Sequence, residues 1–254
     1  AFRDSGGTVA MTFFQQSLGE SVDQLISPAP VHTHGGGMIM GCYSQPSDLY
    51  ARLTNAVGRP FRLHHYWGPL ASVKASEWIA NSVAALLAAP DAPDLCFTYL
   101  PGLDYDLQRF GPTHPKSIQA LATVRRELEH LFATARANGY EAVAFGDYAI
   151  TEVTQGAVFP NRALREAGLF AVRNIHGMSY PDFHQSRAFA LVDHQLAMVS
   201  CLDAATVPRV ADTLRALDGV AQVLDRTQQS VAYEVGHPHA GDLLLVAQPG
   251  AWFA

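Results

Sequence analysis

Two aspartates, Asp104 and Asp147, follow apolar runs of strand length in this sequence of 254 residues. The runs are Asp94–Leu100 and Glu141–Phe145, and the helical pattern Ser117–Asn138 lies between them. Such a strand–helix–strand unit calls for a parallel sheet, in which sites form beyond the carboxyl ends of the strands. We therefore expect both carboxylates at one rim of the sheet, where they suit a hard or borderline divalent cation. Taken singly, an aspartate after a strand is more often a turn former or a helix cap.

Four further polar side chains could take part in a site, namely His32, His34, Arg109 and His194. On an extended backbone His32 and His34 would share one face and could bind a metal, although a flexible glycine-rich loop is the commoner explanation. Asp193 could orient His194 for metal binding or proton transfer, but its place between two apolar runs favours a tight turn or a buried structural pair. Arg109 could pair with a phosphate, or it could tie a loop down.

The hydrophobic patterns alternate between strand and helix along the chain. This alternation predicts a three-layer α/β/α fold with a mostly parallel sheet, as a single domain over residues 1–254. Cap or insert elements are expected near residues 15–70 and 175–235. The expected strands are 8–14, 94–100, 141–145, 169–172, 188–192, 196–201, 221–224 and 243–247; the expected helices are 46–57, 71–87, 117–138, 161–167 and 207–217; the segments 27–45 and 101–115 are expected to be loops.

Composition excludes several classes of protein. With 48% hydrophobic residues and a formal net charge of −6, the chain suits an ordinary globular protein. Its Lys and Arg residues are scattered, which argues against a nucleic-acid polymer as partner, and no apolar stretch approaches the roughly 20 residues that cross a bilayer. The cysteines lie far apart without metal-type spacing, which predicts free thiols and favours a cytoplasmic location. The motifs of serine hydrolases, dinucleotide-binding folds and P-loops are missing from the sequence.

The stretch around Asp104 resembles the type I phosphodiesterase and nucleotide pyrophosphatase family of the alkaline phosphatase superfamily, and in particular its bacterial members. That family carries Asp, then Gly-His, then Gly-Pro in a loop after a strand; Asp104 and Gly111-Pro112 match it, and Gln108 stands at the His position. The family's next motif, Asp-His-Gly, is matched here by Asp147-Tyr148-Ala149. Further similar stretches are Tyr66–Pro69, Tyr99–Pro112, Asn161–Gly168, Ser186–Gln195 and Ala240–Gly250.

The resemblance implies two metal ions, often zinc, that bridge a phosphoryl group and activate a Thr or Ser nucleophile. Asp104 and Asp147 match metal ligands of the family, whereas Gln108 and Tyr148 occupy ligand positions with groups that bind zinc less well than imidazole. The implied activity is hydrolysis of phosphodiester or nucleotide pyrophosphate bonds in a small phosphorylated substrate. The alternative is a non-catalytic relative that binds a small anionic ligand or a protein partner.

Two features of the family are not found at the expected places in this sequence. They are the first strand with the nucleophile that follows it, and a metal-binding His near the C-terminus. We therefore expect this chain to be a piece of a longer protein. The longer protein is expected to carry the activity, and the chain alone is expected to be inactive.

Overall fold

The computed structural model describes residues 2–14, 17–237 and 239–254, which fall into two compact units, Ala1–Ile150 and Thr151–Ala254. The parts of the predicted ranges that fall on residues 1, 15, 16 and 238 lie outside the described residues. The single domain over residues 1–254, with cap or insert elements near 15–70 and 175–235, stays a prediction. Each unit is described by itself below.

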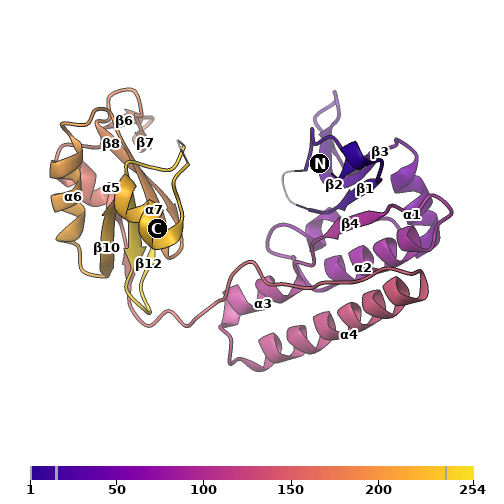
Figure 1. The fold of residues 1–254 in the computed structure, drawn as a ribbon. Coiled ribbons are helices and arrows are strands. Elements are labelled where there is room, and N and C mark those ends of the chain that lie inside the picture. Colours follow the sequence, from indigo (N-terminus) through magenta and orange to yellow (C-terminus); the bar gives the residue numbers. More distant parts are fainter. Residues whose placement is uncertain (1, 15–16, 238) are drawn as a thin grey trace. The chain divides into compact units, whose positions relative to one another are not determined.

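The first unit contains a mostly parallel four-stranded sheet with the order β3-β2-β1-β4 (Figure 1). β1 (Val9–Thr12) pairs in parallel with both β2 (Gln24–His32) and β4 (Leu95–Thr98), whereas β3 (Met38–Gln45) is antiparallel to β2. Short apolar runs such as that of β1 favour this arrangement, because a parallel strand buries both of its faces. The predicted α/β class with a mostly parallel sheet is confirmed in this unit.

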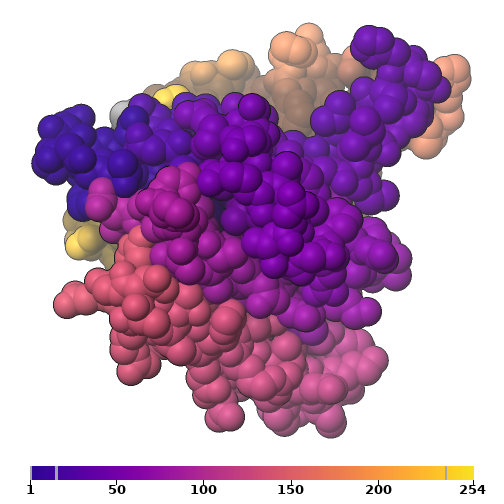
Figure 2. Space-filling view, turned by 90° about the vertical axis from the view of Figure 1, so that its right-hand side faces the viewer, coloured from indigo at the N-terminus to yellow at the C-terminus, as the bar shows by residue number. Residues whose placement is uncertain are grey.

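The prediction of a loop over residues 27–45 is wrong, because most of this segment forms the β2–β3 hairpin. Among the described residues, β1 pairs with Gln24–Ile26 of β2, and the rest of β2 has β3 as its single strand neighbour. Pro28 and Pro30 lie in this part, where one edge of the strand needs no N–H donor, and proline is tolerated at such an edge. Figure 2 shows the far end of the hairpin, in violet, projecting from the body of the first unit.

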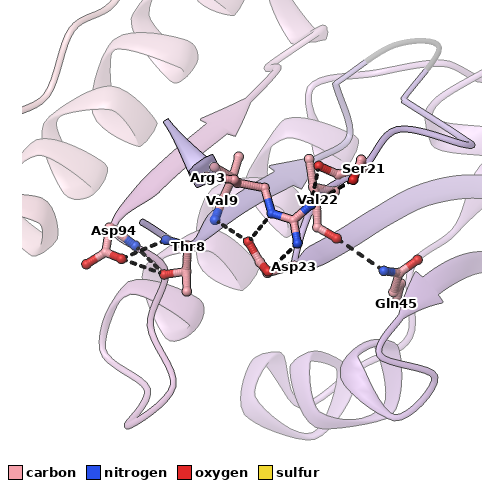
Figure 3. Close-up of polar contacts among 8 residues, drawn as sticks. All are labelled: Arg3, Thr8, Val9, Ser21, Val22, Asp23, Gln45 and Asp94. Atoms are coloured by element: carbon pink, nitrogen blue, oxygen red, sulfur yellow. Dashed lines mark hydrogen bonds and ion pairs between the residues drawn. The ribbon is translucent and has the colours of Figure 1, made fainter. Parts of the chain in front are cut away.

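Two aspartates fix the start of β1 against the segments that lead into its neighbours (Figure 3). Asp23 accepts hydrogen bonds from the backbone N–H of Val9 (2.8 Å) and from the Arg3 guanidinium (2.9 and 3.0 Å), and these contacts lower its pKa. Asp94 accepts from both the backbone N–H and the hydroxyl of Thr8, at 2.8 Å each, which lowers the pKa of this carboxyl as well. Because both acceptors are ionised, these hydrogen bonds are of the stronger kind.

Four α-helices and two short 3-10 helices complete the described part of the first unit. An aromatic cluster lies in its core, where the Trp78 ring is 5.7 Å from that of Phe13 and 5.3 Å from that of Phe61, measured between centroids. The residue at the N-cap position of the first α-helix is Asp48, which makes no side-chain cap bond. The elements are η1 (Arg3–Ser5), α1 (Leu49–Val57), η2 (Leu63–His65), α2 (Lys74–Leu87), α3 (Gly102–Phe110) and α4 (Pro115–Ala137).

Residues 141–145 are not a strand in the part of the chain that the structure describes, and this prediction is wrong. Val143 and Phe145 are 86% and 78% exposed. An apolar run becomes a parallel strand only where a neighbouring strand takes its backbone groups and other layers cover its side chains. This segment gains neither, so Asp147 follows an extended, irregular run and not a strand end.

The second unit contains a four-stranded antiparallel sheet with the order β10-β11-β9-β8 (Figure 1). The predicted strand 169–172 is displaced, because Leu169 is buried in an irregular segment and the strand there begins at Val172. The elements are β5 (Ala157–Val158), α5 (Pro160–Glu166), β6 (Val172–Ile175), β7 (Met178–Pro181), β8 (Ala188–Asp193), β9 (Leu196–Cys201), α6 (Val207–Arg215), β10 (Val220–Asp225), α7 (Arg226–Tyr233), β11 (Leu243–Ala247) and β12 (Trp252–Phe253).

Candidate functional site

The candidate site lies beyond the carboxyl end of β4, where the chain turns directly into α3. The predicted loop 101–115 is wrong over most of its length, because residues 102–110 form this helix. The backbone N–H of Gly102 donates to the hydroxyl of Ser76 on α2 at 2.7 Å, in a buried contact. A Cβ at Gly102 would lie 2.8 Å from the Ser76 hydroxyl oxygen and 3.2 Å from the Cα of Val73. Close approach to α2 therefore selects glycine at the start of α3.

Gly102→Ala is expected to destabilise the protein by about 1–3 kcal/mol, because the added methyl overpacks this contact and strains a buried hydrogen bond. Denaturant unfolding followed by circular dichroism measures the change in the free energy of unfolding. Gly41→Ala is the matched control, since its added Cβ meets nothing within 4 Å. Equal stability of the two variants would show that the contact with α2 leaves room for a side chain.

Asp104 stands in the first turn of α3 and accepts two side-chain hydrogen bonds. The amide of Gln108, one turn later in the helix, donates to Asp104 Oδ1 at 3.0 Å. The phenol of Tyr148 donates to the same oxygen. The structure thus brings together three of the residues that the sequence singled out. The second carboxylate oxygen, Oδ2, receives neither of these two hydrogen bonds.

Asp147 is exposed, and its charge acts on Tyr99, the residue directly after β4. Burial raises the pKa of the Tyr99 phenol above its ordinary value, and the charges of Asp147 and Asp104 raise it further. The pKa of Tyr148 is also raised, first by burial and then by its hydrogen bond to Asp104. Both phenols therefore stay protonated at neutral pH, so they are not anionic ligands, and that of Tyr148 donates to Asp104.

The opposite side of α3 is bound to the segment that precedes α2. Arg109 donates to the carbonyl oxygens of Ala71 (2.8 Å) and Pro69 (3.2 Å), and its guanidinium lies 3.9 Å from Asp106 Oδ1. The hydroxyl of Tyr105 donates to the carbonyl of Tyr66 at 2.8 Å. Arg109 is thus engaged in tying a loop to α3, the second of the two roles considered for it.

The three histidines belong to other elements of the chain. His32 and His34 are exposed at the tip of the β2–β3 hairpin, where the turn is closed by hydrogen bonds between Thr33 and Gly37 at 2.9 Å. His194 belongs to the second unit and forms the turn between β8 and β9 with a backbone φ of 53°. Its Nδ1 lies 2.8 Å from Asp193 Oδ1, and both side chains are exposed. Their participation in a site stays a prediction.

The carboxylates and phenols beside β4 fit part of a divalent metal site and not a whole one. Carboxylate oxygens of Asp104 and Asp147 are suitable ligands, but Gln108 presents an N–H to Asp104 and Tyr148 presents its phenol proton. Among residues 2–14, 17–237 and 239–254 there is no group of three or more His, Cys, Asp or Glu side chains that could hold a metal ion. No reaction step through a metal follows from these residues.

Tyr99 is the site residue that sequence reasoning missed. It lies in the Tyr99–Pro112 stretch that carries the resemblance, yet a tyrosine at the end of an apolar run is indistinguishable from a packing residue. Its position directly after a strand, two residues before a proline, was the available signal.

The family model for type I phosphodiesterase / nucleotide pyrophosphatase matches residues 3–254. The chain belongs to this family. No match was found among curated proteins. Within the described part of the chain, the phosphodiesterase-family protein has no helix that is long and apolar enough to cross a membrane.

Solved structures similar to the phosphodiesterase-family chain confirm the alkaline phosphatase-like fold. Phosphonoacetate hydrolase from Sinorhizobium meliloti 1021, in complex with phosphonoformate, has a TM-score of 0.58 at 16% identity over 100% of this chain and 59% of that chain. Murine ectonucleotide pyrophosphatase / phosphodiesterase 5 has a TM-score of 0.55 at 14% identity over 99% of this chain and 53% of that chain. The human protein of the same name has a TM-score of 0.52 at 11% identity over 100% and 54%. The chain thus spans between half and two thirds of the length of these neighbours.

Proposed function

We propose that the full-length protein hydrolyses phosphodiester or nucleotide pyrophosphate bonds in a small phosphorylated substrate. Asp104 and Asp147 are two carboxylate ligands of a divalent metal, with zinc as the first candidate, in this proposal. The observation that supports it is the place of Asp104 in α3, beyond the carboxyl end of β4, with the charges of Asp104 and Asp147 both acting on Tyr99 at that end. Sheets with parallel strands place their sites at this end.

Membership of the phosphodiesterase family supports the class of reaction. Two solved neighbours are complexes with small phosphorus-containing ligands: phosphonoacetate hydrolase with phosphonoformate, and an inactive variant of the murine phosphodiesterase with AMP. A bound metal would stabilise the negative charge that develops on a phosphoryl group. In this proposal the chain's own residues supply the two carboxylates, with the neutral phenol of Tyr148 donating a hydrogen bond to Asp104.

Chelation tests the metal requirement. The full-length protein is expected to release p-nitrophenol from bis-p-nitrophenyl phosphate, to lose this turnover on dialysis against a strong chelator, and to regain it with zinc. The reason is that the phosphoryl oxygens need a positive charge beside them during the reaction, and carboxylates cannot supply it once the metal is removed. Turnover that survives chelation, with no metal detected by elemental analysis, would contradict metal dependence.

A non-catalytic binding protein is the second candidate, and one observation favours it. Gln108 and Tyr148, which stand where the family has metal-binding histidines, both donate hydrogen bonds to Asp104. This arrangement satisfies one oxygen of the carboxylate, Oδ1, without a cation. Thermal stabilisation of the full-length protein by AMP, in the absence of any turnover, would support this candidate, whereas turnover that Asp147→Asn abolishes in a folded protein would exclude it.

A further inference from the structure

The β2–β3 hairpin exposes two methionines near its far end, which projects from the body of the first unit (Figure 2). Met38 and Met40 are each 51% exposed, and they are two of the five methionines in the chain. Methionine usually fills gaps in a hydrophobic core, where its polarizable sulfur contacts other side chains. Here both thioethers are open to solvent and free to act as ligands.

The register of the hairpin places a histidine on the same face as these methionines. His32, which is exposed, lies directly opposite Met38, and Pro30 lies opposite Met40. Side chains that are directly opposite across two strands share a face, as do side chains two positions apart along one strand. His32, Met38 and Met40 therefore project from one face of the hairpin.

The spacing of these three positions suits a single metal ion. In a regular ladder, the Cβ atoms of an opposite pair such as His32 and Met38 lie about 4.5–5.5 Å apart, and a diagonal pair such as His32 and Met40 lies about 7–8 Å apart. Met38 and Met40 are separated by about 6.6–6.8 Å along the strand. Methionine has three rotatable side-chain bonds, so both sulfurs can reach an ion that the imidazole binds.

The ligand types select the kind of metal. Imidazole nitrogen and thioether sulfur are ligands for soft or borderline ions, and thioethers favour Cu(I) in particular, whereas Mg²⁺, Ca²⁺ and Mn²⁺ prefer carboxylate and carbonyl oxygens. The segment from Leu25 to Gln45 contains no Asp, Glu, Lys or Arg. The hairpin therefore offers no carboxylate for a hard cation and no basic side chain that would repel a metal ion.

The cysteine of the hairpin is not a ligand of this site. Cys42 follows Met40 by two positions and shares its face, but it packs against the core of the first unit. Burial raises the pKa of this thiol to about 12. Metals bind the thiolate form, and this thiol stays protonated at neutral pH. The remaining ligands are one imidazole and two thioethers, a neutral set that suits a cation of single charge.

We propose that His32, Met38 and Met40 bind Cu(I) in a three-coordinate site on one face of the β2–β3 hairpin. The proposal gives His32 the metal-binding role that the sequence suggested for it, with the two methionines as its partners in place of His34. The site shares no residue with the carboxylates beside β4. Its test is a binding measurement that does not require turnover, so it is independent of the proposed hydrolysis.

Methyl NMR of the full chain, labelled with ¹³C at the methionine methyl groups, tests the site directly. Silver nitrate in chloride-free buffer supplies Ag(I), which has the ligand preferences of Cu(I) and is stable in air. It is added in excess over the site and the three free cysteines together. The methyl signals of Met38 and Met40 are expected to shift, whereas those of Met11, Met178 and Met198 are expected to stay in place.

Substitutions measure the contribution of each ligand to the affinity for Cu(I), determined without oxygen by competition with bicinchoninate. Met40→Leu keeps an apolar side chain of similar size and removes the sulfur, and His32→Gln removes the imidazole. Each is expected to weaken binding by about tenfold or more, the least that loss of a metal ligand costs. Met178→Leu is the matched control, because Met178 is 56% exposed on another hairpin and lies opposite Ile175. It is expected to leave the affinity unchanged.

Four results would overturn the proposal. The first is binding of Ag(I) while the methyl signals of Met38 and Met40 stay in place, which would assign the ion to the cysteines. The second is unchanged affinity for Cu(I) in Met40→Leu and in His32→Gln. The third is Zn²⁺ binding at these residues as tightly as Cu(I). The fourth is a shift of the same two methyl signals on dilution of the metal-free protein, together with a halving of its mass in sedimentation, because this face would then be an interface between two copies.

Discussion

Trp78→Ala is expected to lower the free energy of unfolding of the first unit by about 3–5 kcal/mol, the usual cost of removing a large aromatic side chain from a core. Trp78 is 2% exposed and packs against the rings of Phe13, Phe61 and Tyr50. Its indole N–H donates to the carbonyl of Arg59 at 2.8 Å. The substitution therefore leaves a cavity, removes aromatic contacts and strips an acceptor of its donor.

Urea unfolding followed by far-UV circular dichroism measures this loss without relying on tryptophan fluorescence. Trp67→Ala is the control, since Trp67 belongs to the same unit and is 52% exposed. It is expected to change the stability by less than about 1 kcal/mol. A loss of similar size in both variants would mean that the aromatic cluster around Phe13 does not act as the centre of this core.

The pattern of apolar residues within a segment predicted some elements correctly. The strands at Ala188–Asp193 and Leu243–Ala247 and the helix at Lys74–Leu87 follow from apolar runs and helical periodicity. The α7 helix also carries a local signal in its sequence, because Asp225 and Gln228 form a capping box at its start. In these cases the information lies within a few residues.

The elements that could not be predicted depend on distant partners. α3 begins at a proline and a glycine, and it is held by Ser76 and by the carbonyls that Arg109 contacts, which are remote in sequence. The strand expected at 141–145 fails for the opposite reason, because its apolar pattern finds no neighbouring strand in the described chain. Contacts between segments, and not the pattern of either one, decide both outcomes.

The candidate site was also predictable only in part: its residues could be named from the sequence, but the contacts between them could not. The motif around Asp104 singled out this residue and Gln108, the next motif singled out Tyr148, and the structure brings the three side chains together. Their hydrogen bonds could not be inferred, because Tyr148 lies 44 positions beyond Asp104 and reaches it only through the path of the folded chain. Gln108 and Tyr148 stand at sequence positions where the family has metal ligands, but in the structure both donate hydrogen bonds to the Asp104 carboxylate.

Asp104→Asn is expected to lower turnover of the full-length protein by about a hundredfold or more. Substitution of a residue that only orients a metal ligand already costs ten- to a hundredfold, and loss of a ligand's own charge costs at least as much. The asparagine side-chain oxygen can still accept the hydrogen bond from Tyr148, so the local structure is retained while the negative charge is lost. The effect is therefore expected on turnover and on bound metal, with little change in thermal stability.

Asp106→Asn separates this effect from a general loss of charge on α3. Asp106 lies on the same helix and is a distant partner of Arg109, at 3.9 Å, with no hydrogen bond to Gln108 or Tyr148 among the contacts of the described chain. Its substitution is expected to leave turnover of bis-p-nitrophenyl phosphate and the metal content within about twofold of the wild type, as for a surface position. If Asp104→Asn retains full turnover and full metal content, the carboxylate beside β4 serves only to hold Tyr148 and Gln108, and the second candidate function gains the stronger case.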